Sequence, residues 1–165
     1  MAERVGRRRS TRPSKTRRRF SEPNQTERLA KGPLVAKADF GIPLSTTDYE
    51  LCVYDGNDAL LVRARAPHGD VCHNRPCWKE NARGYRYVDR DLTPDGLQHL
   101  GLKAGTSGKS QILVKGRGNN LQAPALSVMN LPVRVQLVNG GGACWEATFN
   151  TTFQNTARAF KAKSD

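Results

Sequence analysis

The stretch Val133-Arg134-Val135-Gln136-Leu137 alternates apolar and polar residues, and this period of two decides the fold class. Successive side chains of a β-strand point to opposite faces, so such a stretch buries one face of a sheet and exposes the other. The same alternation occurs at residues 49–54, 60–65, 100–102, 111–115 and 144–149. No segment has a convincing helical period, and residues 154–163 are compatible with one helical turn or a final strand.

Turn sequences separate these strands at short, regular spacing. Asp55-Gly56-Asn57 and Thr93-Pro94-Asp95-Gly96 are two of them, and their Gly, Pro, Asp and Asn residues are those that tight turns prefer. Short strands joined in this way are typical of a sandwich or barrel. We therefore expect an all-β fold, specifically an antiparallel β-sandwich of jelly-roll-like type.

The basic residues divide the chain into two parts. The formal net charge is +12, and residues 1–37 contain 12 Lys and Arg against three acidic residues, whereas the remainder contains 15 against 12. An Arg-rich segment with few apolar residues cannot offset the roughly 1–2 kcal/mol of backbone entropy that each ordered residue loses. We expect a disordered Arg-rich tail or linker over residues 1–36 and a β-sandwich module over residues 37–165.

Four cysteines form an even set, which is compatible with two disulfides. Cys52 and Cys144 lie on the polar side of their strands, where two neighbouring strands would bring their sulfur atoms together. Cys72 and Cys77 flank a loop short enough to be closed locally. Of the three possible connectivities we expect Cys52–Cys144 with Cys72–Cys77, and the other two stay open.

Disulfides form in oxidising compartments, so this cysteine usage predicts an extracellular or periplasmic location. The start of the chain points the other way, because the first 30 residues lack the apolar core of a secretory signal. No run of 18 apolar residues that would span a membrane occurs either. We expect either that the start of a longer secreted precursor is missing or that Met1 is mis-assigned. The alternative is a cytosolic protein whose cysteines stay reduced.

Three motifs that carry chemistry elsewhere have simpler interpretations here. Residues 105–110 end in Gly-Lys-Ser like a phosphate-binding loop, but an alternating strand follows where that loop needs a helix. Cys72, His73 and Cys77 lack the second close pair of ligands that structural zinc usually has. The aspartates of residues 89–95 have oxygen spacing that suits calcium but lack the rest of a calcium loop. We predict no metal, no cofactor and no catalytic residues.

Two segments are candidate binding surfaces. Aromatic and basic residues mix at positions 78–87, and such a strand, if exposed, stacks on bases or sugars; the alternative is an aromatic face packed in the core. The possible ligand surface comprises Trp78, Tyr85, Arg86 and Tyr87. Arginine clusters in the tail neutralise phosphates without reading sequence, the alternative being a plain linker. The possible phosphate contacts are Arg7, Arg8, Arg9, Arg17, Arg18 and Arg19.

Several short sequence motifs, which follow one another in a fixed order after residue 37, resemble those of a known kind of module. They include Cys144-Trp145-Glu146-Ala147-Thr148-Phe149 and lie at residues 38–43, 46–55, 76–79, 93–96, 102–109, 114–121, 132–139, 144–149 and 160–163. Together they resemble an uncharacterised β-rich module found at the C-termini of secreted bacterial proteins. The resemblance covers roughly residues 36–165 and implies export and an accessory role. It implies no catalytic residue, and it also implies that the chain is part of something larger.

These observations lead to two functional hypotheses. The first is a non-enzymatic, extracytoplasmic structural or adhesion/binding module for an unknown cell-surface or extracellular ligand. The alternative is a nucleic-acid-binding protein that acts through the Arg-rich tail.

Overall fold

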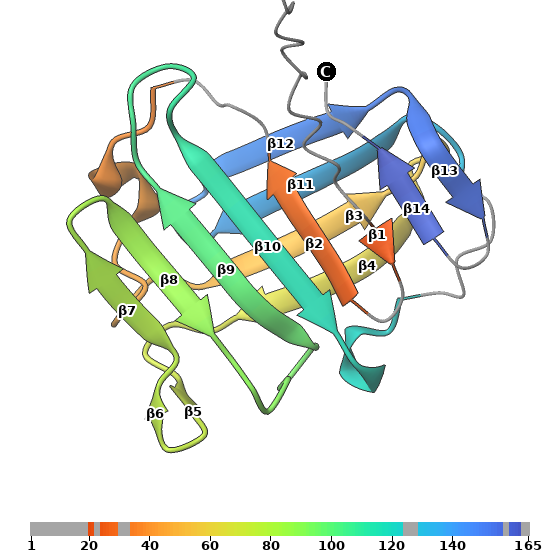
Figure 1. Ribbon diagram of the computed structural model, residues 1–165. Coiled ribbons are helices and arrows are strands. Elements are labelled where there is room, and N and C mark those ends of the chain that lie inside the picture. The colour runs from red at the N-terminus through yellow and green to blue at the C-terminus, as the bar shows by residue number, and fades with distance from the viewer. Residues whose placement is uncertain (1–19, 22–23, 30–33, 124–128, 157–158, 163–165) are drawn as a thin grey trace, which may run out of the picture.

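The computed structural model describes residues 20–21, 24–29, 34–123, 129–156 and 159–162. In this part of the chain every regular element longer than four residues is a β-strand, and all strand pairs are antiparallel. Figure 1 shows the two larger sheets as two layers, one behind the other. The predicted all-β, antiparallel fold is therefore confirmed. The jelly-roll-like sandwich topology goes beyond this finding and stays a prediction.

The stretch that predicts the fold forms the centre of a four-stranded sheet, ordered β12-β11-β3-β4. Val133, Val135 and Leu137 of β11 are completely buried, whereas Arg134 and Gln136 between them are half-buried on the other face. The alternation read from the sequence thus separates a core face from an outer face. The strands are β3 (Tyr49–Tyr54), β4 (Leu60–Ala66), β11 (Val133–Asn139) and β12 (Cys144–Phe149).

The second layer is a six-stranded sheet, ordered β1-β2-β10-β9-β8-β7. Residues 105–110 connect the antiparallel strands β9 and β10, so the segment after Gly-Lys-Ser is a strand, as predicted, and not the helix of a phosphate-binding loop. The strands are β1 (Phe20–Ser21), β2 (Asn24–Leu29), β7 (Trp78–Asn81), β8 (Gly84–Val88), β9 (Leu97–Lys103) and β10 (Gln111–Arg117).

Small elements complete the fold. One hairpin joins β5 (Val71–Cys72) to β6 (Arg75–Pro76), and another joins β13 (Thr152–Thr156) to β14 (Ala159–Ala162). The described residues of the segment 154–163 therefore follow the strand alternative rather than the helical one. Two short 3₁₀ helices, η1 (Lys37–Phe40) and η2 (Asn119–Leu121), lie in connections.

The inner faces of the two sheets share one hydrophobic core. Trp78 links the layers, because its ring centroid lies 5.2 Å from that of Tyr87 in the six-stranded sheet and 5.5 Å from that of Tyr49 in the four-stranded sheet. The Trp78 indole also donates a hydrogen bond to the Pro67 carbonyl at 2.7 Å. Buried aromatic side chains remove large apolar areas from water, so these three rings hold the two layers together.

Some described residues lie inside the segment 1–36 that the sequence assigns to the tail, and the boundary at residue 36 stays a prediction. Residues assigned to the tail form β1 and β2, and β2 pairs with β10 over six positions. Val35, also assigned to the tail, is buried and bridges to Gly105. The sequence of β2, Asn-Gln-Thr-Glu-Arg-Leu, is almost entirely polar, so no apolar alternation marked it as a strand. Strand β2 joins the sheet through backbone pairing with β10.

Candidate functional site

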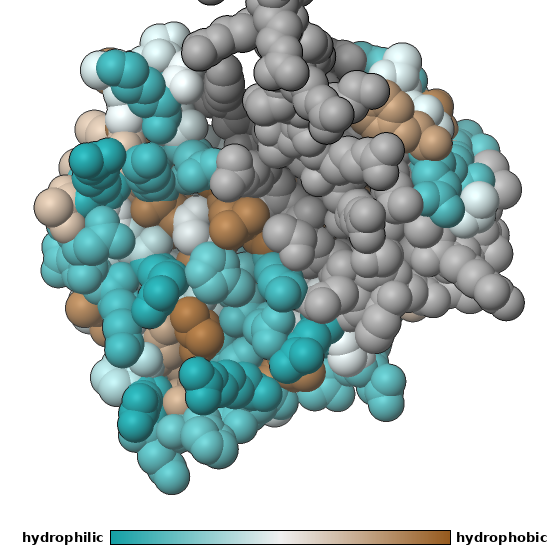
Figure 2. Space-filling model, in the orientation of Figure 1, coloured by the Kyte–Doolittle hydropathy of each residue, from teal (hydrophilic) through white to brown (hydrophobic). Residues whose placement is uncertain are grey.

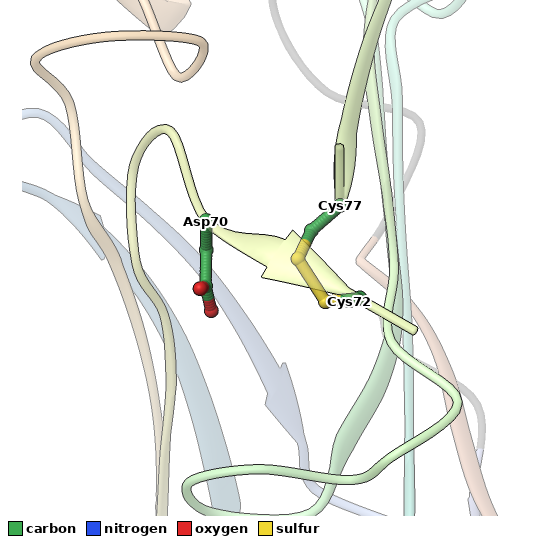
Figure 3. Close-up of side chains that lie close together, drawn as sticks. All are labelled: Asp70, Cys72 and Cys77. Atoms are coloured by element: carbon green, nitrogen blue, oxygen red, sulfur yellow. A yellow bond between two sulfur atoms is a disulfide. The ribbon is translucent and has the colours of Figure 1, made fainter. Parts of the chain in front are cut away.

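A disulfide joins Cys72 to Cys77 across the β5–β6 hairpin, so this half of the predicted pairing is confirmed. Asp70 lies beside it (Figure 3), with a carboxylate oxygen and both sulfur atoms within 4.8 Å of one another. Zinc binds thiolates, and sulfur atoms joined in a disulfide are not thiolates. His73, the other residue of the zinc alternative, contacts Asp91 instead. The disulfide therefore acts as a local staple.

The predicted Cys52–Cys144 disulfide is wrong, and both thiols are free. Strand β11 lies between the strands that carry them, and Cys52 pairs with Gln136 whereas Cys144 pairs with Val138. Two strand spacings amount to about 10 Å, beyond the roughly 7 Å that a disulfide spans between Cα atoms. Both residues do lie on the outer face of the sheet, as their alternation indicates. The prediction failed because it assumed that their strands are neighbours.

The predicted aromatic ligand surface is also wrong, because its rings face the core. Trp78, Tyr85 and Tyr87 are all buried, and Tyr87 is completely so. Burial raises the pKa of the Tyr87 phenol above its ordinary value, with nearby carboxylates adding to the shift. Arg86, which alternates with the two tyrosines, is the one member of the set that is exposed. The outward side of β8 is therefore basic and not aromatic.

Arg86 belongs to a larger set of outward residues on β7 to β10. Lys79 pairs with Arg86, Arg86 with Gly101, and Gly101 with Leu113, so these four residues form one row across the sheet. Side chains in such directly opposite positions are neighbours on the same face. A second row contains His99 and Lys115, and a third contains Lys103 and Gln111. We name this surface the cationic face: Lys79, Asn81, Arg86, Val88, His99, Gly101, Lys103, Gln111, Leu113 and Lys115.

The cationic face contains no carboxylate, and its Lys and Arg residues form no salt bridge within the described part of the chain. Figure 2 views this side of the molecule, where hydrophilic residues predominate and hydrophobic ones are scattered between them. The pKa of His99 is lower than the ordinary value of 6.5. Burial of the ring is the largest cause, and the positive charges of Arg86 and Lys115 add to it. The field on this face is thus positive, and no described neighbour neutralises it.

A depression of about 260 Å³ lies on the cationic face around Gly101. Gly101 has no side chain, whereas its cross-strand neighbours Arg86 and Leu113 do, so Gly101 contributes only backbone atoms to the depression. The basic residues at the rim are Arg83, Arg86 and Lys103, and Leu113 and Gln111 line the opposite side. A glycine inside a strand weakens it and often marks a position where another molecule approaches closely.

The outer face of the four-stranded sheet has the opposite character. Arg63 contacts Glu50 at 2.7 Å, and Arg65 contacts Asp95 at 2.9 Å. Arg134 has two acidic neighbours, Asp58 at 2.8 Å and Glu146 at 3.7 Å, and lies over the ring of Tyr54. We name this surface the paired face: Arg63, Arg65 and Arg134 with Glu50, Asp58, Asp95 and Glu146.

The aspartates considered for calcium do not form one ligand set. Asp89 is buried and accepts hydrogen bonds from the backbone amides of Asp91 and Thr93. Asp91 contacts His73, and Asp95 contacts Arg65. Each carboxylate therefore stabilises a different part of the loops.

The possible phosphate contacts of the tail lie outside the described residues: Arg7, Arg8, Arg9, Arg17, Arg18 and Arg19. Lys79, His99, Lys103 and Lys115 lie far apart along the chain, so no local sequence pattern predicted them as one site. Each is a polar residue in an alternating strand, a signal that predicts exposure but not which strands adjoin.

None of the helices in the described part of the chain has the length and apolar character that crossing a bilayer requires. Comparisons with protein-family models, with curated proteins and with solved structures found no match for the chain. The resemblance to a module of secreted bacterial proteins therefore stays a prediction.

Proposed function

We propose that the chain is a non-enzymatic extracytoplasmic binding module that adheres to an acidic polysaccharide through the cationic face. The observation that carries this proposal is the group of basic side chains on β7 to β10, which form no salt bridge with any described residue. A positive surface of this kind attracts anionic polymers and concentrates them near it. The Cys72–Cys77 disulfide supports a location outside the cytoplasm, where acidic polysaccharides occur on cell surfaces.

A polysaccharide fits this surface better than a nucleic acid. Proteins that bind single strands stack bases on exposed aromatic side chains. The outward positions of β7 to β10 contain no aromatic residue except His99, because Trp78, Tyr85 and Tyr87 face the core. The surface therefore supplies charge, hydrogen-bond donors and a depression, but no platform for bases.

The test compares retention of full-length variants on immobilised polygalacturonate and on heparin. A cation close to an anionic surface contributes on the order of 1 kcal/mol, so removal of three weakens binding by roughly a hundredfold. We name the variant that removes them the cationic-face variant: Lys79→Gln, Arg86→Gln and Lys115→Gln. The matched control removes three charges from the opposite surface and is named the paired-face variant: Arg63→Gln, Arg65→Gln and Arg134→Gln.

We expect the cationic-face variant to lose retention and the paired-face variant to keep it. Equal losses in both variants would overturn the proposal, because net charge alone would then explain binding. Retention only on immobilised duplex DNA would also overturn it. In that case the arginine clusters of the tail become the leading explanation, and replacement of the six tail arginines by glutamine in the full chain should abolish retention on DNA.

A further inference from the structure

Gly101 lies at the centre of the cationic face. Its direct neighbours across the sheet are Arg86 and Leu113, and its neighbours on the same face of β9 are His99 and Lys103. All four have side chains that rise above the sheet, so the missing side chain of Gly101 leaves the floor of the depression as bare backbone. The backbone conformation of Gly101 does not require glycine, since its φ lies outside the left-handed region.

The rim of the depression is chemically divided. Arg83, Arg86 and Lys103 offer charged donors on one part of the rim. Leu113 offers an apolar wall, and the backbone of Gly101 forms part of the floor. A ligand that fits this arrangement has a compact ring with an apolar face and one oxyanion. Arg side chains suit that oxyanion, because the guanidinium group binds carboxylate and sulfate groups through paired hydrogen bonds.

The size of the depression limits the ligand further. Its volume of about 260 Å³ falls below the 300–1,000 Å³ that is typical of pockets for drug-sized ligands. One sugar ring matches this space, and a chain of several rings would continue beyond it over the rest of the cationic face.

We infer that the depression over Gly101 is a subsite for one acidic sugar residue, whose carboxylate or sulfate contacts Arg83, Arg86 and Lys103 while its ring lies against Gly101 and Leu113. This inference rests on the proposed function, since it names the part of the cationic face that recognises a single residue of the polymer. Long-range attraction comes from the whole face, whereas selectivity for the acidic ring comes from the depression.

The decisive variant is Gly101→Val, which fills the depression and removes no charge. A Cβ at this position would lie 3.3 Å from His99 Cε1 and 3.6 Å from Leu113 Cβ, distances that a small side-chain shift relieves. Valine also favours strands. The control is Gly140→Val in the β11–β12 turn, where a Cβ would meet only the backbone of Asp48, at 3.6 Å. Gly101→Ser is a smaller second substitution for use if the valine variant does not fold.

The measurement is NMR titration of the ¹⁵N-labelled full chain with galacturonate, glucose 6-sulfate and neutral galactose. We expect either acidic sugar to shift the amide signals of Gly101, Arg86 and Leu113, and galactose to shift them at least tenfold less at equal concentration. The two acidic sugars distinguish a carboxylate from a sulfate as the preferred group. Gly101→Val should abolish the shifts, and Gly140→Val should leave them unchanged. The spectra also report whether each variant is folded.

Two results would overturn the subsite: galactose shifts these signals as strongly as the acidic sugars, or Gly101→Val leaves the shifts intact. Polymer retention on the polygalacturonate column separates this failure from failure of the proposed function. If retention depends on the cationic face but no acidic sugar shifts these signals, the proposed function stands and the subsite is wrong. If the polymer is not retained at all, the proposed function is wrong.

Discussion

The outer faces of the two larger sheets both carry basic side chains, yet they differ in how those charges are balanced. Arg63, Arg65 and Arg134 on the four-stranded sheet each have a carboxylate within 4.0 Å. On the six-stranded sheet, Lys79, Arg86, Lys103 and Lys115 have none in the described part of the chain. The first arrangement neutralises its own field and the second leaves it available to a partner.

The difference shows that the number of basic residues on a surface does not determine its capacity to bind anions. Ion pairs on the paired face engage the donors that an anion would need, and they add modestly to stability. Unpaired cations on one face repel one another and lower stability slightly, but they create a potential that extends to about a Debye length, near 8 Å at physiological salt. The comparison predicts that removal of the acidic partners converts one kind of face into the other.

The largest expected effect follows from that conversion. In the cationic-face variant, neutralisation of the paired face's acidic residues frees three arginines and should restore retention on polygalacturonate by roughly a hundredfold, the factor expected for three cations. The added substitutions are Glu50→Gln, Asp58→Asn, Asp95→Asn and Glu146→Gln. Galacturonate alone should not bind to this surface, because the depression over Gly101 is on the other sheet. Absence of any regained retention would mean that unpaired arginines are not sufficient.

Stability should respond more strongly to loss of an arginine on the paired face than on the cationic face. Arg134→Gln removes contacts to Asp58, Glu146 and the Tyr54 ring, and should lower the free energy of unfolding by about 1 kcal/mol. Arg86→Gln removes no hydrogen bond or salt bridge to the described residues and should change the free energy of unfolding by less than about 0.5 kcal/mol. Urea denaturation of both variants at pH 7 provides the measurement. Equal destabilisation would show that Arg86 has a structural role that the contacts do not reveal.

The free cysteines give a third comparison, now within the paired face. Cys52 is buried between Glu50 and its cross-strand neighbours Arg63 and Gln136, whereas Cys144 is exposed. Burial, followed by the Glu50 carboxylate, raises the pKa of the Cys52 thiol. We expect native Cys52 to react with a maleimide roughly tenfold more slowly than Cys144.

Intact mass after labelling provides the measurement for the cysteines. Unfolded protein without reductant should show two labelled thiols, and reduced protein should show four. Arg86→Ala on the cationic face should leave the labelling of both cysteines unchanged. Detection of no free thiol before reduction would restore the Cys52–Cys144 disulfide as a possibility in solution.

The smallest expected effect concerns pH and His99. Burial, then Arg86 and Lys115, lower its pKa in the folded state; Val88 and Gly101, its other neighbours on this face, carry no charge. Because protonation is harder in the folded chain than in the unfolded one, the His99 contribution to stability is present above about pH 6.5. It is lost as the pH falls through the lowered pKa. His99→Gln should remove this part of the pH dependence in urea denaturation.

The same histidine distinguishes the two faces. NMR titration of the His99 ring should give a higher pKa in the double variant Arg86→Gln and Lys115→Gln. The value should stay below 6.5, because burial is the larger cause. The paired-face variant should leave the pKa of His99 unchanged. An equal increase in both variants would mean that overall net charge, and not these two neighbours, lowers it.

The sequence predicted the individual strands better than it predicted which strands and which cysteines pair with one another. The alternation in β3, β4, β9, β10, β11 and β12 predicted the strands, and the turn residues predicted their connections. It did not reveal β2, whose polar residues show no apolar period. The Cys72–Cys77 disulfide was predictable because it closes a loop of six residues. The Cys52–Cys144 pairing was not, since it required knowledge of which strands adjoin.

For the candidate site too, the sequence predicted local features but not which distant residues come together. The alternation of Arg86 with Tyr85 and Tyr87 predicts that Arg86 lies on the face opposite to the two tyrosines. The sequence left open which of the two faces is buried in the core. Lys79, Gly101 and Leu113 come together with Arg86 only through the register of three hairpins. Positions that far apart in the chain carry no local signal of one another.

By itself, the sequence determined the period of two, the turn chemistry and the charge of each strand, because these are local properties that the backbone geometry of a strand converts directly into faces. Only the tertiary structure decided which faces turn inward, which strands adjoin and which cations meet carboxylates. Those outcomes depend on hydrogen bonds and packing between residues distant along the chain. The positive face with its depression over Gly101 is therefore a product of strand order.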